Sequence, residues 1–270
     1  MIARLITALL FIPFLTYSIF SKYSLCFALI IAGIIIIGLI EIILLSQQSG
    51  AKPFKILCFV LGIPLIIIAY IKPSWYHLFS GCFLILFWLL FICGLLSKNE
   101  FLKRFGPTLA VVIYVVYLLS HLILIKHLPH SSSMLFFLFM VVWLTDTGAY
   151  IFGTRFGKHK LIPQISPNKS VEGAVAGCIS GIIAGVIAFI ICQRCYPLDT
   201  FIRIPMAQVI FLGFTLSILS QISDLIESSI KRVAGVKDSG NWIPGHGGLL
   251  DVFDSVILTA PFLYYWMITK

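Results

Sequence analysis

The sequence predicts an all-α fold, a polytopic transmembrane helix bundle of about nine spans. Sixty per cent of the 270 residues are hydrophobic, only 11% are charged, and the mean hydropathy is +1.08. This composition leaves too little polar surface for a soluble domain of this length. The apolar runs are continuous and long enough to cross a bilayer as helices, whereas barrel strands would alternate in polarity. We therefore expect residues 1–270 to form a single integral membrane domain.

The expected spans follow the apolar runs along the chain, and their boundaries are approximate. They are Leu5–Phe20, Leu25–Leu45, Ile56–Ile71, Leu78–Leu96, Thr108–Ile125, Met134–Gly153, Gly173–Ile191, Ile204–Ile230 and Leu249–Met267.

The basic residues predict the orientation of the bundle. With the N-terminus inside, thirteen of the 19 lysines and arginines fall in cytoplasmic segments, which is the positive-inside pattern. The net charge of +9 is spread over short loops between apolar runs. This distribution argues against nucleic acid as a partner and favours contact with membrane lipids or a phosphorylated substrate.

The first five spans contain a single conspicuous charge, Glu41, late in the second span. A carboxylate inside a membrane helix is costly and is a functional candidate by default. Because Gln47 and Gln48 follow closely, we expect Glu41 to reach the cytoplasmic interface or to pair with a loop cation.

Asp146 in the sixth span is the first strong candidate for a functional residue. It lies nine residues before Arg155, or roughly 13 Å from the cytoplasmic end of the span at helical rise. An ionised carboxylate at that depth needs a cation, a polar partner or water, so a functional role competes with a structural ion pair.

A polar loop from Gly153 to Gly173 follows the sixth span. Ser170 or Asn168 is expected to cap the next helix. The loop also carries a basic cluster that could receive a phosphate, although positive-inside bias would explain the same charges. The cluster comprises Arg155, Lys158, Lys160 and Lys169.

The eighth span is longer than a bilayer requires, so its cytoplasmic end should project from the membrane. Asp224 and Glu227 lie three residues apart near that end, and Glu227 and Lys231 lie four apart. An ordinary ion pair at a solvated helix end explains Glu227 and Lys231. It explains Asp224 less well, because apolar residues flank it.

Half of the ten acidic residues fall between Asp224 and Ser255. Within this stretch a glycine-rich turn, Gly245-His-Gly-Gly248, precedes the last span, whose first turns carry Asp251 and Asp254. Glycines before a helix let backbone N–H groups approach an anion. Carboxylates beside such a turn fit a divalent cation that bridges them to a phosphate, and Mg²⁺ prefers one or two carboxylates together with substrate phosphates. The topology brings Asp146, Asp224 and Asp251 toward the cytoplasmic side.

This stretch resembles the signature of the phosphatidate cytidylyltransferase (CDP-diacylglycerol synthase) family, which closely covers the C-terminal half of the chain. Val252 stands where the family usually has arginine. Asp146–Tyr150 and Ser166–Gly173 also look like the family, with Asn168 and Ser170 as mild departures. The matching signature positions are Ser228, Ile230, Lys231, Arg232, Lys237, Asp238, Gly240, Ile243, Pro244, His246, Gly247, Gly248, Leu249, Asp251, Phe253 and Asp254.

The resemblance implies transfer of a cytidylyl group from CTP to phosphatidic acid, giving CDP-diacylglycerol and pyrophosphate. It implies Mg²⁺ in a paired-metal centre, with a monovalent ion such as K⁺ as a candidate for the second site. It further suggests a bacterial cytoplasmic (inner) membrane, an active site facing the cytoplasm, a homodimer, structural spans in 1–130 and a catalytic half in 131–270.

The candidate site residues fall into three groups. The metal candidates are Asp224 and Asp251, with Asp146 and Asp254 beside them. The catalytic candidates are Lys231, Arg232, Lys237, Asp238 and His246. The substrate-binding candidates are Ser166, Lys169, Ser228, Gly247 and Gly248.

Three other functions remain open from the sequence. A CTP-dependent polyprenol or phytol kinase would use similar metal chemistry with a hydroxyl acceptor. A transporter of an anionic solute would use the intramembrane carboxylates as a relay, but should show repeated halves. An inactive scaffold has only Val252 in its favour.

Overall fold

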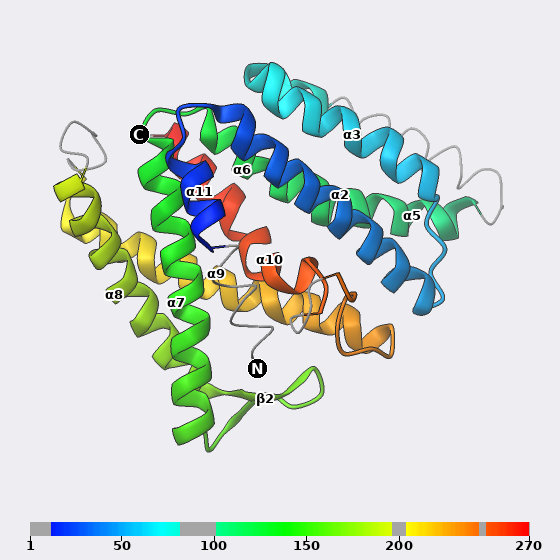
Figure 1. The fold of residues 1–270 in the computed structure, drawn as a ribbon. Helices are drawn as coiled ribbons and strands as arrows, with labels where there is room; N and C mark the ends of the chain where they lie inside the picture. Colours follow the sequence, from blue (N-terminus) through cyan, green and yellow to red (C-terminus); the bar gives the residue numbers. More distant parts are fainter. Residues whose placement is uncertain (1–11, 82–100, 196–203, 243–246, 270) are drawn as a thin grey trace. The chain divides into compact units, whose positions relative to one another are not determined.

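The computed structural model describes residues 12–81, 101–195, 204–242 and 247–269 (Figure 1). Within these ranges the secondary-structure elements are all helices apart from one two-stranded hairpin, and loops connect them, which confirms the all-α membrane fold. Five helices in the described ranges are long and apolar enough to cross a membrane. They are Ser24–Gln48, Lys103–Lys126, Ser131–Phe156, Val171–Cys195 and Met206–Val233. The chain is a multi-pass membrane protein.

Two compact units share the chain. The first comprises Met1–His127 and Ile230–Val252, and the second comprises Leu128–Ser229 and Phe253–Lys270. Two helices contribute to both: α9 (Met206–Val233) gives its last residues to the first unit, and α10 (Leu250–Ile257) gives its first residues to it.

The first unit is built on apolar helices that pack against one another. Residues 12–20 are helical. Helix α2 contacts α3, α6 and the π-helical segment η2, and Figure 1 shows α2 and α3 side by side. These helices are apolar around most of their circumference, as expected for membrane spans. The bounds are α2 Ser24–Gln48, α3 Lys55–Ile71, η1 Pro73–Trp75, α5 Phe101–Val111, η2 Val112–Tyr117 and α6 Leu118–Lys126.

Two of the expected spans in this unit need comment. The fifth one is present, but it begins earlier, as α5, and passes through the π-helical η2 before α6. Residues 82–96 of the expected fourth span lie outside the described residues.

The second unit is organised by close packing of α7 (Ser131–Phe156) and α8 (Val171–Cys195). Glycines recur every fourth residue on α8, from Gly173 to Gly185. A Cβ at Gly181 would lie 2.5 Å from Thr145 Oγ1 on α7 and 2.7 Å from Ser217 Cβ on α9. Small residues let membrane helices approach this closely and gain packing contacts.

The segment between α7 and α8 is an antiparallel hairpin rather than the expected loop. Strand β1 is Lys160–Ile162 and strand β2 is Ser166–Ser170. The Ser170 hydroxyl accepts a hydrogen bond from Gly173 N at 3.1 Å, which confirms Ser170 as the cap of α8. Glu172 accepts hydrogen bonds from the backbone N–H groups of Lys158 and His159, which ties the hairpin to the start of α8.

The last expected span is not one continuous helix. It is divided at Leu258 into α10 and α11 (Thr259–Ile268). Pro261, in the first turn of α11, fits this division, because proline has no N–H to donate to the carbonyl four residues earlier.

Candidate functional site

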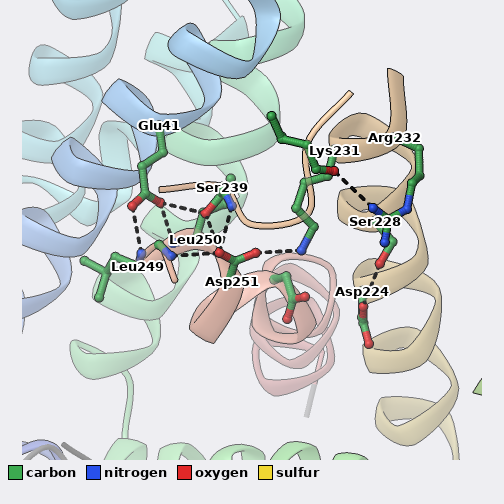
Figure 2. A network of polar contacts seen from close by, with 12 residues as sticks. Glu41, Asp224, Ser228, Lys231, Arg232, Ser239, Leu249, Leu250 and Asp251 are labelled. Carbon is green, nitrogen blue, oxygen red and sulfur yellow. Dashed lines mark hydrogen bonds and ion pairs between the residues drawn. The ribbon is translucent and has the colours of Figure 1, made fainter. Parts of the chain in front are cut away.

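Glu41 is the centre of a buried polar network in the first unit (Figure 2). Its side chain is fully buried. Glu41 Oε1 accepts a hydrogen bond from Leu249 N at 2.8 Å, and Oε2 accepts one from Leu250 N at 2.7 Å. These N–H groups belong to the start of α10, where a helix leaves its backbone donors without intrahelical partners. Glu41 therefore acts as the N-terminal cap of α10.

Ser239 links Glu41 to Asp251. Its hydroxyl lies 3.1 Å from Glu41 Oε2 and 2.9 Å from Asp251 Oδ2. A hydroxyl has a single proton to donate. The two carboxyl groups therefore share one donor. A substitution at Glu41 will change the hydrogen bonding of Asp251.

Asp251 is held tightly by this network. Its Oδ2 also accepts hydrogen bonds from Ser239 N and Gly248 N, both at 2.8 Å. Its Oδ1 lies 2.6 Å from Lys231 Nζ, and both side chains are nearly buried. One oxygen of Asp251 is thus fixed by the protein, while the other faces a positive charge.

The two glycines of the turn are required by these carboxylates. A Cβ at Gly248 would lie 2.0 Å from Ser239 Oγ and 2.6 Å from Glu41 Oε1. Gly247 has a φ of +94°, a left-handed conformation that favours glycine, and a Cβ there would lie 2.8 Å from Asp251 Oδ2. The turn thus allows the backbone to wrap closely around Glu41 and Asp251.

A second polar cluster lies in the second unit and contains Asp146, Asp224 and Lys169. Lys169 Nζ on β2 is 2.6 Å from Asp224 Oδ2 on α9. Ser228, one turn further along α9, donates a hydrogen bond to Asp224 Oδ1 at 3.3 Å (Figure 2). Asp146 on α7 interacts electrostatically with both Asp224 and Lys169, and the Ser255 side chain hydrogen-bonds to it. Asp146 and Asp224 thus belong to one cluster of the second unit, while the expected convergence of both with Asp251 stays a prediction.

Asp254 is buried beside this cluster and helps to hold α10 on α9. Its Oδ1 accepts hydrogen bonds from the backbone and hydroxyl of Ser255. Its backbone carbonyl accepts a hydrogen bond from Ser223 on α9. Asp254 therefore has a structural position as well as a candidate role at a metal.

The remaining candidates are distributed as follows. Arg232, Lys237 and Asp238 are exposed, and Arg232 donates a hydrogen bond to Val236 O. Ser166 begins β2 and is half-buried. His246 lies outside the described residues.

The structure bears on two sequence expectations about carboxylates. Among the described residues, Glu41 is fully buried and bonds to Ser239 and to the backbone of α10 rather than to a loop cation, while its depth relative to the membrane interface stays a prediction. Glu227 is fully buried and Lys231 is nearly so, so they do not form a solvated helix end. The packing of α9 covers both residues.

Glu41 and Ser239 belong to this network but are not among the candidate site residues that the sequence predicts. The signal for Glu41 was present, because a carboxylate in a membrane helix demands partners. The partners of Glu41 could not be predicted from the sequence, since Ser239 is 198 positions away in the chain.

The carboxylates suit a hard cation such as Mg²⁺, which binds carboxylate oxygens. Asp224 and Asp251 each direct one oxygen at a lysine ammonium 2.6 Å away, so each carboxylate is already oriented toward positive charge. Within the described ranges, no three His, Cys, Asp or Glu side chains come together as a preformed metal cage. A metal role for Asp224 and Asp251 therefore stays a prediction.

Comparisons with known proteins identify the family of the chain. The model of the cytidylyltransferase family matches residues 2–269. A phosphatidate cytidylyltransferase of Staphylococcus saprophyticus is 40% identical over 173 residues, which is 62% of this chain and 61% of the relative. The phosphatidate cytidylyltransferase of Bacillus subtilis is 37% identical over 179 residues, 66% of this chain and 64% of the relative.

The aligned part of the chain thus spans less than two thirds of the length of these two relatives. The family model, by contrast, covers nearly the whole sequence, including both polar clusters. On that match, this chain belongs to the cytidylyltransferase family.

Proposed function

We propose that the chain is a phosphatidate cytidylyltransferase, which makes CDP-diacylglycerol and pyrophosphate from CTP and phosphatidic acid during phospholipid biosynthesis. The observation that carries the proposal is the buried pair of Lys231 and Asp251. In the proposed reaction Lys231 would bind a phosphate and Asp251 would bind a metal ion, and the hydrogen bonds from Ser239 N and Gly248 N hold the Asp251 carboxylate in place. The relatives named for this reaction support it.

The nucleotide would be held by cations and backbone donors. Lys231, with the exposed Arg232 and Lys237, supplies positive charge for the triphosphate, and Asp238 and His246 lie in the same segment. Gly247 and Gly248 are the backbone candidates for a phosphate contact, although the N–H of Gly248 is already bonded to Asp251. Asp224 and Asp251 would hold Mg²⁺, with Asp146 and Asp254 as further ligands and K⁺ as a candidate second ion. The bound ions would neutralise the charge of the two phosphates.

The chemistry requires alignment more than proton transfer. A phosphate oxygen of phosphatidic acid forms a bond to the α-phosphorus of CTP. The bond from that phosphorus to the bridging oxygen breaks, and pyrophosphate leaves with the electron pair. Since the nucleophile is already an anion, Lys169, Ser166 and Ser228 need only orient it and reduce repulsion.

The proposed setting is the bacterial cytoplasmic membrane, with the active site facing the cytoplasm, where CTP is available. The excess of basic residues in the inner loops supports this orientation. The family resemblance also supports a homodimer.

The direct test supplies purified protein in detergent with CTP labelled in the α-phosphate, phosphatidic acid and Mg²⁺. We expect a labelled liponucleotide and an equal amount of pyrophosphate, and no turnover when EDTA replaces Mg²⁺. Parallel reactions contain phytol or dolichol in place of phosphatidic acid, with CTP labelled in the γ-phosphate, which is the group that a kinase would transfer. Absence of liponucleotide above a control without enzyme would refute the proposal, and a phosphorylated alcohol would indicate a kinase.

The metal role of Asp251 has its own test. Asp251→Asn keeps the size of the side chain but removes its charge, so turnover should fall by at least about a hundredfold, as expected when a charge acting on the transition state is lost. The variant should still insert into the membrane. Full activity in Asp251→Asn would contradict a metal role for this residue.

A further inference from the structure

A pocket of about 560 Å³ lies in the first unit, away from the Glu41 network described above. It is formed where α2 ends, α3 begins and α5 begins. Its lining residues are Gln47, Lys52, Pro53, Phe54, Lys55, Ile56 and Arg104.

The pocket is held in shape by contacts between the loop and α5. Arg104 Nε donates a hydrogen bond to Lys52 O at 2.9 Å, and the guanidinium lies 4.3 Å from the centre of the Phe54 ring. Phe54 N donates to Thr108 Oγ1 at 2.8 Å. Thr108 Oγ1 in turn donates to Arg104 O at 2.8 Å. The guanidinium is therefore pre-oriented rather than free to move with solvent.

The charge of the pocket favours an anion. Three of its lining residues are cations, and the described lining contains no carboxylate. Positive-inside topology explains why basic residues lie at this end of the helices. It does not explain why Lys52, Lys55 and Arg104 converge on one hollow. A planar guanidinium fixed by stacking is well suited to a phosphate.

An apolar stripe leads away from the pocket along α3. It starts at the pocket residue Ile56, which is 81% exposed, and ends at Ile71, which is 66% exposed. Between them lie Val60, Ile63 and Ile67, which are also exposed. These residues lie three or four positions apart, so they share one face of the helix. The stripe is about 22 Å long at helical rise, a length comparable to an extended acyl chain.

We propose that this pocket binds the phosphate of an anionic membrane lipid, with an acyl chain of the lipid along the exposed stripe of α3. Lys52, Lys55 and Arg104 contact the phosphate. Free nucleotide or inorganic phosphate would meet the same cations, but neither would use the stripe. The proposal does not rest on the proposed enzymatic reaction.

Phosphatidylglycerol is the best probe, because it is anionic but is not the proposed substrate. Native mass spectrometry of the full chain, with phosphatidylglycerol or zwitterionic phosphatidylcholine added in detergent, measures binding without turnover. We expect the intact protein to retain phosphatidylglycerol in preference. Arg104→Gln should weaken this binding roughly tenfold, since hydrogen bonds to charged groups are among the strongest. Lys55→Gln should weaken it roughly threefold, as an exposed charge contributes less.

Lys103→Gln is the matched control, because Lys103 is exposed beside Arg104 but does not line the pocket. It should bind phosphatidylglycerol like the unmodified protein. An equal loss in Lys103→Gln would overturn the proposal in favour of general surface charge. Displacement of the lipid by millimolar inorganic phosphate or CTP would contradict the proposal that a lipid occupies the pocket. Circular dichroism and gel filtration check folding, and Arg104→Lys should recover part of the affinity.

Discussion

Glu41 is the residue whose replacement most directly tests the buried network. Glu41→Leu leaves Leu249 N and Leu250 N without their acceptor, and the Ser239 hydroxyl keeps only Asp251 as its acceptor. Each buried donor left unpaired costs about 1–3 kcal/mol, so we expect a large fall in the midpoint of thermal unfolding in detergent. Because Ser239 also bonds to Asp251, activity should fall as well.

Two further variants control this prediction. Glu41→Gln keeps one acceptor oxygen and the shape of the side chain, so it should be affected less than Glu41→Leu. Ser46→Ala, on the same helix, removes only a local hydrogen bond to Ile42 O and should shift stability by less than about 0.5 kcal/mol. Equal stability of Glu41→Leu and Ser46→Ala would contradict the capping role.

For single residues, the sequence singled out the candidate site residues more successfully than it identified their hydrogen-bond partners. The cost of charge in a membrane was enough to single out Asp146 and Asp224, and the structure brings these two together. The same reasoning flagged Glu41 but assigned it a simple interfacial position. Its actual partners depend on how the chain folds back over nearly 200 residues, which no local pattern records.

Among the helices, α8 offers the clearest test of packing. Gly181→Ala would bring its Cβ to 2.5 Å from Thr145 Oγ1, so α7, α8 and α9 would have to shift. We expect a loss of about 1–3 kcal/mol, which is typical of overpacking, measured as a lower midpoint of thermal unfolding. Gly33→Ala on α2 is the matched control, because no heavy atom lies within 4 Å of its added Cβ.

The control should be neutral or slightly stabilising, since alanine favours helix more than glycine does. A comparable loss in both variants would mean that the glycines of α8 are not a packing device. The test compares one substitution in two membrane helices, so differences in helix propensity cancel.

Element boundaries were predicted well where apolar length alone decides them, as for α2 and α3. The observed boundaries differ from the expected ones where a local feature of the sequence overrides apolar length. Pro261 divides the last span, and this break was readable from the sequence. The hairpin of β1 and β2 was not, because its short strands carry little alternation and are stabilised partly by Glu172 from α8.

For the whole molecule, the division into units could not be predicted from hydropathy. The segment Ile230–Val252 belongs with the N-terminal spans rather than with the neighbouring C-terminal ones. The hydrogen bonds that Glu41 accepts from Ser239 and from the start of α10 are the physical reason. Hydropathy measures the preference of each segment for lipid, but it contains no information about which polar groups pair.

The orientation of the whole chain in the membrane remains a prediction from charge, and it can be tested by thiol labelling. Lys72 and Lys237 are both exposed and lie in segments predicted to be on opposite sides. Each is replaced by cysteine in a background where the seven native cysteines are serine, and the background must retain its activity. A membrane-impermeant maleimide should label Lys72→Cys in spheroplasts and Lys237→Cys only in inverted vesicles. The reversed pattern would place the polar segment Asp224–Ser255 on the side of the membrane that lacks CTP. It would therefore exclude the proposed reaction and show that the positive-inside rule fails for this loop.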